Sequence, residues 1–253
     1  MNNQEDQKTS QPWNALAEVY ASSRHVSADQ LIEWPAQLRM SGDFQGKHVL
    51  DVGCATGDKA RFFAEHGAQS VLAIDPSEGF SQHWKAHAAC SRLSFATGTF
   101  EDLLTLPAVS SKKFDLIVTF QALMYARDLN ETVKTLSSLL SPGGNLILSI
   151  PHPFRFAILK NEIEGWGHGY AYQKTAPYRY PSPWKADVLL EHATPRVSDY
   201  ANAITAAGLR IEAIDEPAAT DDLRKIAPDK ALWMDRYVGI LIFRAHLDAE
   251  LSR

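Results

Sequence analysis

The amino-acid sequence predicts an α/β fold in which helices cover both faces of a parallel β-sheet. Short apolar runs, a pattern typical of buried strands, alternate with segments whose apolar residues recur at helical spacing. A glycine-containing turn follows the first of these runs. Strands and helices in regular alternation form crossover connections, and such connections build a doubly wound parallel sheet.

Five apolar runs carry the strand pattern, and they cover residues 48–52, 70–74, 93–96, 114–120 and 145–150. The helix expected over residues 59–66 ends at Gly67, which suits the left-handed conformation found after helix ends. Ser77 or Asp75 could cap the start of the next helix, and Pro76 suits one of its first positions. A third helix, over residues 129–140, ends at a Pro-Gly-Gly sequence.

The two ends of the chain depart from this alternation. Residues 1–12 are polar and are expected to be disordered, whereas residues 13–40 have the spacing of covering helices. Residues 151–190 hold eight aromatic side chains without a clear period, which indicates a substrate-lid insertion within a single domain of residues 1–253. A helix over 198–207, a strand over 209–214 and a strand over 238–243 follow, and the last is apolar enough to lie inside the sheet.

Composition and charge restrict the class of protein. The chain has 25 basic and 30 acidic side chains, so it lacks the basic surplus that nucleic-acid backbones require. No run approaches the ~20 apolar residues of a membrane span, and the polar N-terminus does not resemble a secretory signal. Its two cysteines indicate no disulfide framework. We therefore expect a cytoplasmic protein that binds neither nucleic acid nor a membrane, with the number of subunits left open.

The turn after the first strand has the character of a ligand-binding loop. Residues 49–57 are VLDVGCATG, and glycine lets backbone amides approach a ligand closely because it has no side chain. A phosphate-binding P-loop needs four residues between its glycines and then Lys-Ser or Lys-Thr, whereas three residues separate Gly53 from Gly57 and Asp58 follows. The dinucleotide pattern GxGxxG is not matched either, which weakens that interpretation.

This loop resembles the first motif of the class I S-adenosylmethionine-dependent methyltransferases. Asp51, Gly53 and Gly57 match that motif, and Ala55 stands where the family usually has its middle glycine. Asp75 follows 24 residues after Asp51 at the end of the second strand, where a carboxylate can accept hydrogen bonds from both hydroxyls of a ribose. The segments TGTFEDL, FDLIVTFQ and LSSLLSPGGNLILSIPHP are similar to the later motifs of the family, in the same order.

The resemblance covers residues 13–253 and implies both a fold and a cofactor. The fold is a mostly parallel, seven-stranded sheet whose last strand is antiparallel, and the cofactor is S-adenosylmethionine, with S-adenosylhomocysteine as its product. The loop at Gly53 would hold the amino-acid end, Asp75 the ribose, and Phe100 with Glu101 the adenine. The residues that the resemblance places against the cofactor are Tyr20, Asp51, Gly53, Cys54, Ala55, Gly57, Asp75, Pro76, Thr99, Phe100, Glu101, Phe120 and Gln121.

The acceptor of the methyl group is expected to be small. The sequence TFQA at the fourth strand differs from the Asn/Asp-Pro-Pro-aromatic motif of enzymes that methylate adenine or glutamine. The aromatic insertion lies at the carboxyl end of the sheet, so we expect transfer to an O or N atom of a small, aromatic metabolite. His152 and His192 resemble positions in bacterial small-molecule methyltransferases and are candidate bases, with structural hydrogen bonding as the alternative. Tyr125 is a candidate contact to substrate or cofactor, with packing as the alternative.

Other functions remain open at this point. An NAD-dependent oxidoreductase would share the generic fold, and a catalytically silent S-adenosylmethionine-binding protein would share the whole motif set. His83, His87 and Cys90 have a helical spacing that can ligate zinc, but no fourth ligand accompanies them, and no metal is expected. Cys54 lacks a neighbouring base in the sequence, which argues against a nucleophilic role.

Overall fold

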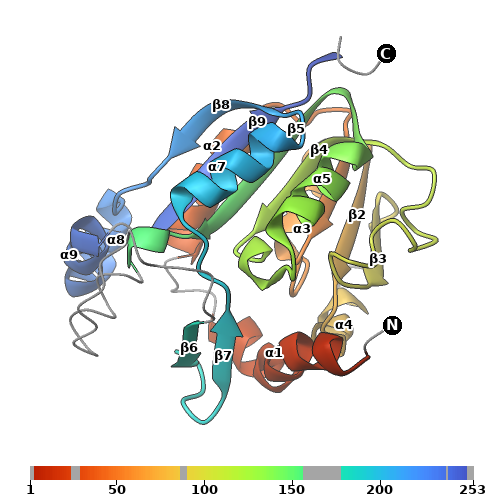
Figure 1. Ribbon diagram of the computed structural model, residues 1–253. Helices are drawn as coiled ribbons and strands as arrows, with labels where there is room; N and C mark the ends of the chain where they lie inside the picture. The colour runs from red at the N-terminus through yellow and green to blue at the C-terminus, as the bar shows by residue number, and fades with distance from the viewer. Residues whose placement is uncertain (1–2, 24–28, 86–89, 156–177, 238, 250–253) are drawn as a thin grey trace.

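The computed structural model describes residues 3–23, 29–85, 90–155, 178–237 and 239–249, and within them a seven-stranded sheet forms the centre (Figure 1). Its strands are β1 (His48–Val52), β2 (Ser70–Asp75), β3 (Leu93–Thr97), β4 (Phe114–Phe120), β5 (Leu140–Pro151), β8 (Arg210–Asp215) and β9 (Ile240–His246). Their order is β3-β2-β1-β4-β5-β9-β8. Neighbours from β3 to β5 pair in parallel, and β9 runs antiparallel to both β5 and β8. The expected sheet with an inserted antiparallel last strand is therefore confirmed.

Helices cover both faces of this sheet, and Figure 1 shows α5 and α7 in front of it and α2 behind it. The helices are α1 (Asn3–Ser23), α2 (Trp34–Ser41), α3 (Asp58–Glu65), α4 (Glu78–Trp84), α5 (Leu129–Leu139), α7 (Val197–Ala206), α8 (Asp221–Ile226) and α9 (Pro228–Tyr237). A π-helical turn η2 (Asp29–Glu33) precedes α2, and a 3-10 turn η4 (Leu123–Tyr125) follows β4. None of the described helices combines the length and the apolar character that crossing a bilayer requires.

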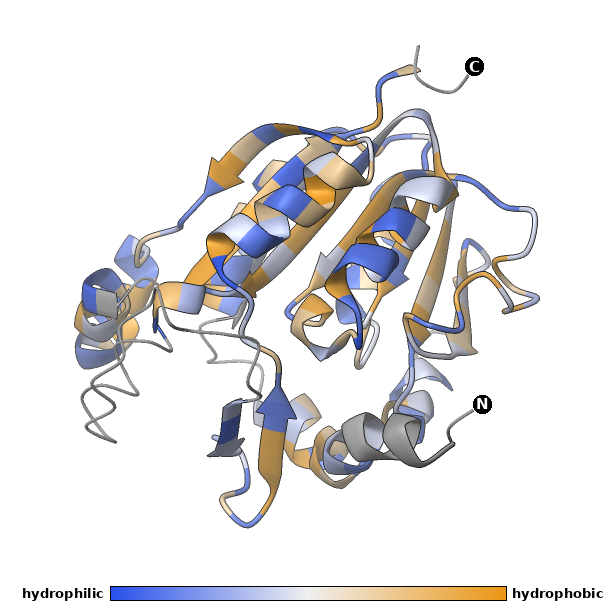
Figure 2. Cartoon of the chain, viewed as in Figure 1, coloured by the Kyte–Doolittle hydropathy of each residue, from blue (hydrophilic) through white to orange (hydrophobic). Residues whose placement is uncertain are grey.

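Two hydrophobic layers result from the alternation of side chains along each strand. On β1, Leu50 belongs to the layer under α5 and α7, and Val49 belongs to the layer under α2 and α3. On β4, Ile117 joins the first layer and Val118 the second. Figure 2 shows the strands of the central sheet largely in the hydrophobic colour. Burial on both faces explains why the strands are continuous apolar runs in the sequence.

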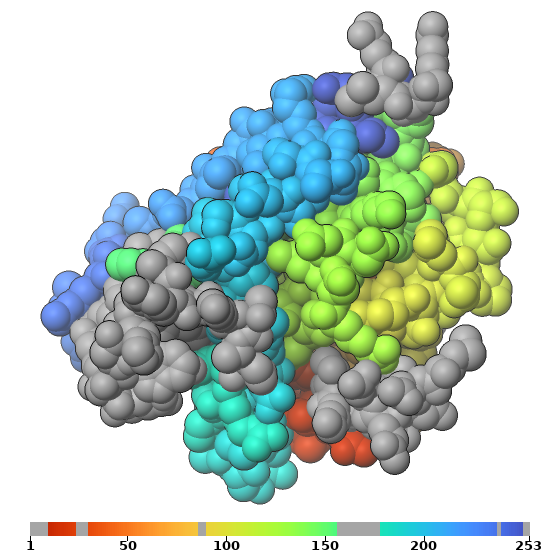
Figure 3. Space-filling model, viewed as in Figure 1, coloured from red at the N-terminus to blue at the C-terminus, as the bar shows by residue number. Residues whose placement is uncertain are grey.

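The structure differs from the sequence predictions at several elements. Helix α1 begins at Asn3, so residues 3–12 are helical and not disordered. The buried side chains Leu16 and Ala17 anchor the second half of α1, and the helix extends toward the N-terminus from that anchor. The sequence did not predict α8, α9 or a hairpin of β6 (Tyr178–Pro181) with β7 (Leu189–His192). Figure 3 shows this hairpin projecting from the body of the molecule.

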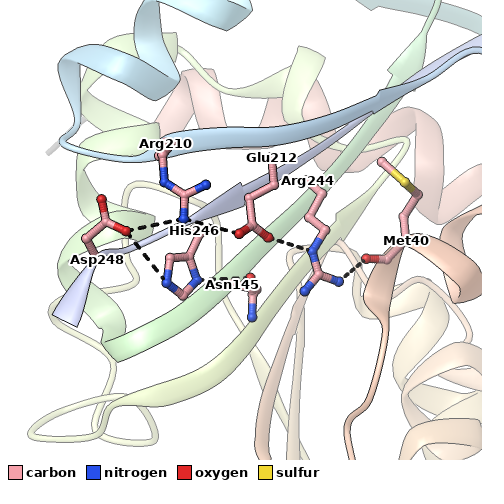
Figure 4. A network of polar contacts seen from close by, with 7 residues as sticks. All are labelled: Met40, Asn145, Arg210, Glu212, Arg244, His246 and Asp248. Carbon is pink, nitrogen blue, oxygen red and sulfur yellow. Dashed lines mark hydrogen bonds and ion pairs between the residues drawn. The ribbon is translucent and has the colours of Figure 1, made fainter.

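A network of charged side chains joins β8, β9 and α2 at one edge of the sheet (Figure 4). Arg244 donates from Nε to Glu212 at 2.9 Å and from a terminal nitrogen to the carbonyl of Met40 at 2.8 Å. Arg210 lies 3.3 Å from both Glu212 and Asp248. The register between β8 and β9 shifts next to Glu212, so this carboxylate joins two arginines where the strand pairing is irregular.

We expect Glu212→Gln to lower the free energy of unfolding at pH 7 by about 0.5 kcal/mol, as for a partly exposed ion pair. The hydrogen bond from Arg244 holds the pKa of Glu212 below its usual value, so the stabilisation is present above the unfolded-state pKa of about 4.3. It is lost as the pH falls through the lowered folded-state pKa. The unfolding free energies of the wild-type protein and Glu212→Gln should therefore become equal at low pH, and urea unfolding of both proteins from pH 7 to pH 3 measures this. Glu65→Gln, which removes the ion pair with Arg61, is the control. A constant difference across this range would contradict the assignment.

Candidate active site

A cavity of about 490 Å³ opens where the parallel strands end, at the edge of the sheet where open α/β folds bind ligands. The last residues of β1, β2 and β4 and the loops that follow them form its floor. The predicted site residues that line it are Tyr20, Gly53, Ala55, Asp75, Pro76, Thr99, Phe100, Glu101, Phe120, Gln121 and Tyr125. The structure therefore brings together most of the predicted cofactor residues and one of the three predicted catalytic residues.

The loop after β1 is fixed by close packing against the loop after β4. Gly53 has φ of 84°, a conformation that L side chains rarely adopt, and its amide donates to the carbonyl of Ile74 at 2.8 Å. A Cβ atom built on Gly53 would lie 2.3 Å from the Cβ atom of Ala122. Gly57, with φ of 81°, precedes α3 and donates to the carbonyl of Cys54 at 2.9 Å. Glycine is needed at position 53 both for backbone conformation and for space.

Ala55 adopts the conformation that a glycine would adopt at this position. Its φ is 48°, in the left-handed region, which costs an alanine roughly 1–2 kcal/mol relative to ordinary backbone. Its amide donates to Oδ2 of Asp75 at 2.9 Å, and its carbonyl accepts from Nε1 of Trp84 at 2.8 Å. These two hydrogen bonds hold the residue in place, so the loop keeps its shape although the family's middle glycine is absent.

Asp75 is a buried carboxylate at the end of β2. Its Oδ2 accepts from the amide of Ala55, and its Oδ1 accepts from the amide of Ser77 at 2.9 Å. Burial raises its pKa from 3.8 to about 6, although the two backbone hydrogen bonds act in the opposite direction. A carboxylate has about four acceptor positions, so two remain for donors that enter the cavity. This is the chemistry that two ribose hydroxyls would satisfy.

The loop after β3 forms the adjoining wall. Thr99 donates to Oδ2 of Asp102 from both its amide and its hydroxyl, each at 2.8 Å. Glu101 accepts from the amide of Arg127 at 3.0 Å, which ties this loop to the segment after β4. Phe100 is buried beneath the cavity and contributes to the hydrophobic core. This wall presents an apolar ring with polar groups beside it, an arrangement suited to a flat heterocycle.

Three predicted cofactor residues support the loop without lining the cavity. They are Asp51, Cys54 and Gly57. Asp51 and Cys54 are buried. Burial, with the neighbouring charges of Asp75 and Asp51, raises the pKa of the Cys54 thiol well above its usual value. The thiol therefore stays protonated and is unsuited to act as a nucleophile.

His152 is not positioned to act as the base that the sequence suggested. It is buried and lies outside the residues that line the cavity. Its Nε2 lies 2.7 Å from Oε1 of Glu216, and its Nδ1 accepts from the amide of Phe154 at 3.1 Å. Because both ring nitrogens bind protein groups, His152 has the structural role that was the alternative.

His192 also does not line the cavity, and it packs against two tyrosines that do. Its Nδ1 donates to the carbonyl of Ala193 at 2.7 Å, and burial lowers its pKa. Its ring packs edge-on against Tyr125, with 5.7 Å between centroids, and against Tyr180 at 5.6 Å. Tyr125 and Tyr180 share a hydrogen bond, and burial raises the pKa of Tyr125 well above its usual value. Tyr125 therefore faces the cavity as a protonated hydroxyl, and His192 supports it.

Aromatic side chains from distant segments complete the cavity, and no motif identified them. Trp13 of α1 and Trp184 of the hairpin have ring centroids 5.7 Å apart, and Trp184 lies 5.0 Å from Tyr20. The aromatic enrichment of the insertion was the one signal for Trp184. Residues 156–177 of the insertion lie outside the described residues, as does His87, one of the three residues whose spacing could ligate zinc but for which no metal is expected.

Arg155 and Trp233 also line the cavity, and no sequence motif pointed to either residue. The guanidinium carbon of Arg155 lies 4.4 Å from the centre of the Trp233 ring. Burial lowers the pKa of Arg155, and Glu33 opposes this effect. The side chain stays charged at neutral pH because an arginine pKa lies far above it.

Comparison with known proteins identifies the family. A family model described as a methyltransferase domain matches residues 24–213. A ubiquinone biosynthesis O-methyltransferase of Coxiella burnetii is 35% identical over 106 residues, 42% of this chain and 44% of the relative. A tRNA U34 carboxymethyltransferase of Idiomarina loihiensis is 33% identical over 117 residues, 46% of this chain and 36% of the relative. The chain thus spans less than half the length of these two curated relatives.

A solved structure agrees with the family model. The S-adenosylmethionine-dependent methyltransferase from Mesorhizobium loti superposes with a TM-score of 0.66 at 25% identity, over 85% of this chain and 97% of that one. The chain therefore belongs to the methyltransferase-domain family, among the class I S-adenosylmethionine-dependent methyltransferases.

Proposed function

We propose that this protein transfers the methyl group of S-adenosylmethionine to an O or N atom of a small, aromatic acceptor bound in the cavity. The single observation that carries this proposal is that two different groups of residues line the same cavity. One part is the polar cradle of Gly53, Ala55 and Asp75, and the other is the aromatic wall of Trp13 and Trp184.

The residues of the cradle fit the cofactor. Asp75 has a desolvated carboxylate with two acceptor positions left, which two ribose hydroxyls would use. The loop from Gly53 to Gly57 would hold the amino-acid end, and Phe100 with Glu101 the adenine. When bound, S-adenosylmethionine supplies a methyl group on a positively charged sulfur.

The rest of the reaction depends on alignment by this chain's own residues. Methyl transfer is an in-line displacement, so a protein accelerates it mainly by holding donor and acceptor in line and excluding water. Gln121 lines the cavity, and its buried Nε2 has no hydrogen-bond partner among the described residues, so it can orient a ligand oxygen. No histidine lines the cavity within the described part of the chain. We therefore assign orientation of the acceptor to Gln121 and Tyr125.

The named relatives suggest two different acceptors. The Coxiella relative is an O-methyltransferase of ubiquinone biosynthesis, which supports oxygen in a small molecule as the target. The Idiomarina relative acts on tRNA by its name. The net charge of -5 and the aromatic lining of the cavity favour the small molecule for this chain.

We expect S-adenosylhomocysteine to raise the thermal stability of the protein and NAD to leave it unchanged. A ligand that binds only the native state at 100 times its Kd adds about 2.7 kcal/mol to the free energy of unfolding. Thermal unfolding with each ligand measures this difference, and stabilisation by NAD alone would contradict the proposal. Transfer of labelled methyl groups to phenols, amines and tRNA then identifies the acceptor class. Cofactor binding without transfer to any of them would indicate a silent binding protein.

A further inference from the structure

We propose that the methyl acceptor carries an oxyanion, a carboxylate or a phosphate, that is held by the guanidinium group of Arg155. This inference rests on the proposed function, because it describes the acceptor of that same site. Arg155 lies four residues after the end of β5 and lines the same cavity as Gly53 and Asp75. The Nε atom of Arg155 is buried and has no hydrogen-bond partner in the part of the chain that the structure describes.

A buried donor without a partner is costly, and proteins satisfy nearly all such groups. The cost is greater for a charged group. An oxyanion would satisfy Nε and a terminal nitrogen of Arg155 together, since two parallel hydrogen bonds from a guanidinium match a carboxylate or a phosphate. The unpartnered Nε therefore indicates which chemistry the ligand brings to this position.

Trp233 fixes the orientation of the guanidinium group. Its ring lies 4.4 Å from the guanidinium carbon, within the range of a cation–π contact. This contact comes from α9, an element far from Arg155 in the sequence. A stacked guanidinium loses less conformational freedom when it binds a ligand, so the position is prepared for a planar, bidentate partner.

The groups around Arg155 favour its charged form. Glu33 lines the same cavity, and its negative charge raises the pKa of the guanidinium. The other groups that influence Arg155 are Tyr178 and Tyr180, which are neutral at physiological pH. An acceptor anchored at Arg155 would then extend along the aromatic wall toward the cradle.

Calorimetry on the full chain saturated with S-adenosylhomocysteine tests this inference. The probes are benzoate and phenyl phosphate, with benzamide as the neutral comparison. We expect the wild-type protein to bind at least one anion ten-fold or more tightly than benzamide, and Arg155→Met to abolish this preference. Arg155→Lys, which keeps the charge but loses the fork, is expected to retain part of it. Arg179→Met removes an exposed arginine paired with Glu191 outside the cavity and is the matched control, with an unchanged preference.

The outcomes separate the two proposals. Equal or absent binding of both anions in the wild-type protein, or a preference that persists in Arg155→Met, would overturn the anion site. Binding of S-adenosylhomocysteine to each variant shows that the variant is folded. The anion titrations are repeated without it, so a protein that fails to bind S-adenosylhomocysteine but keeps an Arg155-dependent anion preference would overturn the methyltransferase proposal alone. A preference for benzoate over phenyl phosphate, or the reverse, assigns the anion.

Discussion

Gly53→Ala is expected to lower the free energy of unfolding by about 2–5 kcal/mol, the largest effect that we expect from a single substitution at the site. Two costs add. The left-handed backbone at φ of 84° disfavours any residue with a Cβ atom, and that atom would lie 2.3 Å from the Cβ atom of Ala122. Because the loops after β1 and β4 would have to separate, cofactor affinity is expected to fall as well. Urea unfolding measures the stability, and calorimetry with S-adenosylhomocysteine measures the affinity.

Two further variants separate these costs. Gly143 has a similar φ of 80°, and a Cβ atom there would meet nothing within 4 Å, so Gly143→Ala measures the conformational cost alone. Adding Ala122→Gly to Gly53→Ala removes the collision and is expected to restore part of the stability. A Gly53→Ala protein no less stable than Gly143→Ala would show that the two loops do not pack as described.

Asp75→Ala is expected to weaken the binding of S-adenosylhomocysteine by about 1–3 kcal/mol, roughly 5- to 150-fold in Kd. The substitution removes the buried carboxylate, and with it the proposed hydrogen bonds to the ribose and the hydrogen bond from the amide of Ala55. Asp43→Ala is the matched control, because Asp43 also accepts from the amide two residues ahead but lies outside the cavity. Unchanged affinity in calorimetry would remove Asp75 from the site.

The binding of S-adenosylhomocysteine is also expected to depend on pH through Asp75. Burial raises the pKa of this carboxyl to about 6, so below that pH it is protonated and can accept fewer hydrogen bonds. Its effect on folding has the opposite sign. The neutral form favours the folded state, and this stabilisation is present below the unfolded-state pKa of about 3.9 and lost as the pH rises through 6. We expect affinity to fall between pH 7 and pH 5 in the wild-type protein, and this fall to be absent in Asp75→Asn.

Local sequence was sufficient to predict the strands that carry the site. The bounds of β1 and β4 agree with the prediction, because both are apolar runs buried on two faces and ended by polar or turn residues. The strand pattern predicted Asp75 at the end of β2 and Gly53 in the loop after β1. Parallel strands bring their carboxyl ends to one edge, and the resemblance to the methyltransferase motifs pointed to the residues of the cradle.

The sequence was a weaker guide to hairpins, short helices and histidines. The β6–β7 hairpin and α8 have few buried positions, so their period is hard to recognise. His152 and His192 were candidates because they resemble positions in bacterial small-molecule methyltransferases and because histidine titrates near neutrality, but neither property says where a ring points. In the structure, Nε2 of His152 lies against Glu216, Nδ1 of His192 donates to the carbonyl of Ala193, and neither histidine lines the cavity.

The sequence alone determined the order of strands and helices, the glycine loop and the acidic residue at the end of β2. These features depend on residues that are close together in the chain, because such residues set the spacing of buried side chains and the local backbone conformation. Only the tertiary structure decided which side chains line the rest of the cavity, because Trp13, Arg155 and Trp233 come from three distant segments. Their meeting depends on packing between elements, and no local pattern encodes that packing. The residues of the polar cradle could therefore be predicted from the sequence, whereas the rest of the cavity wall could be identified only from the folded structure.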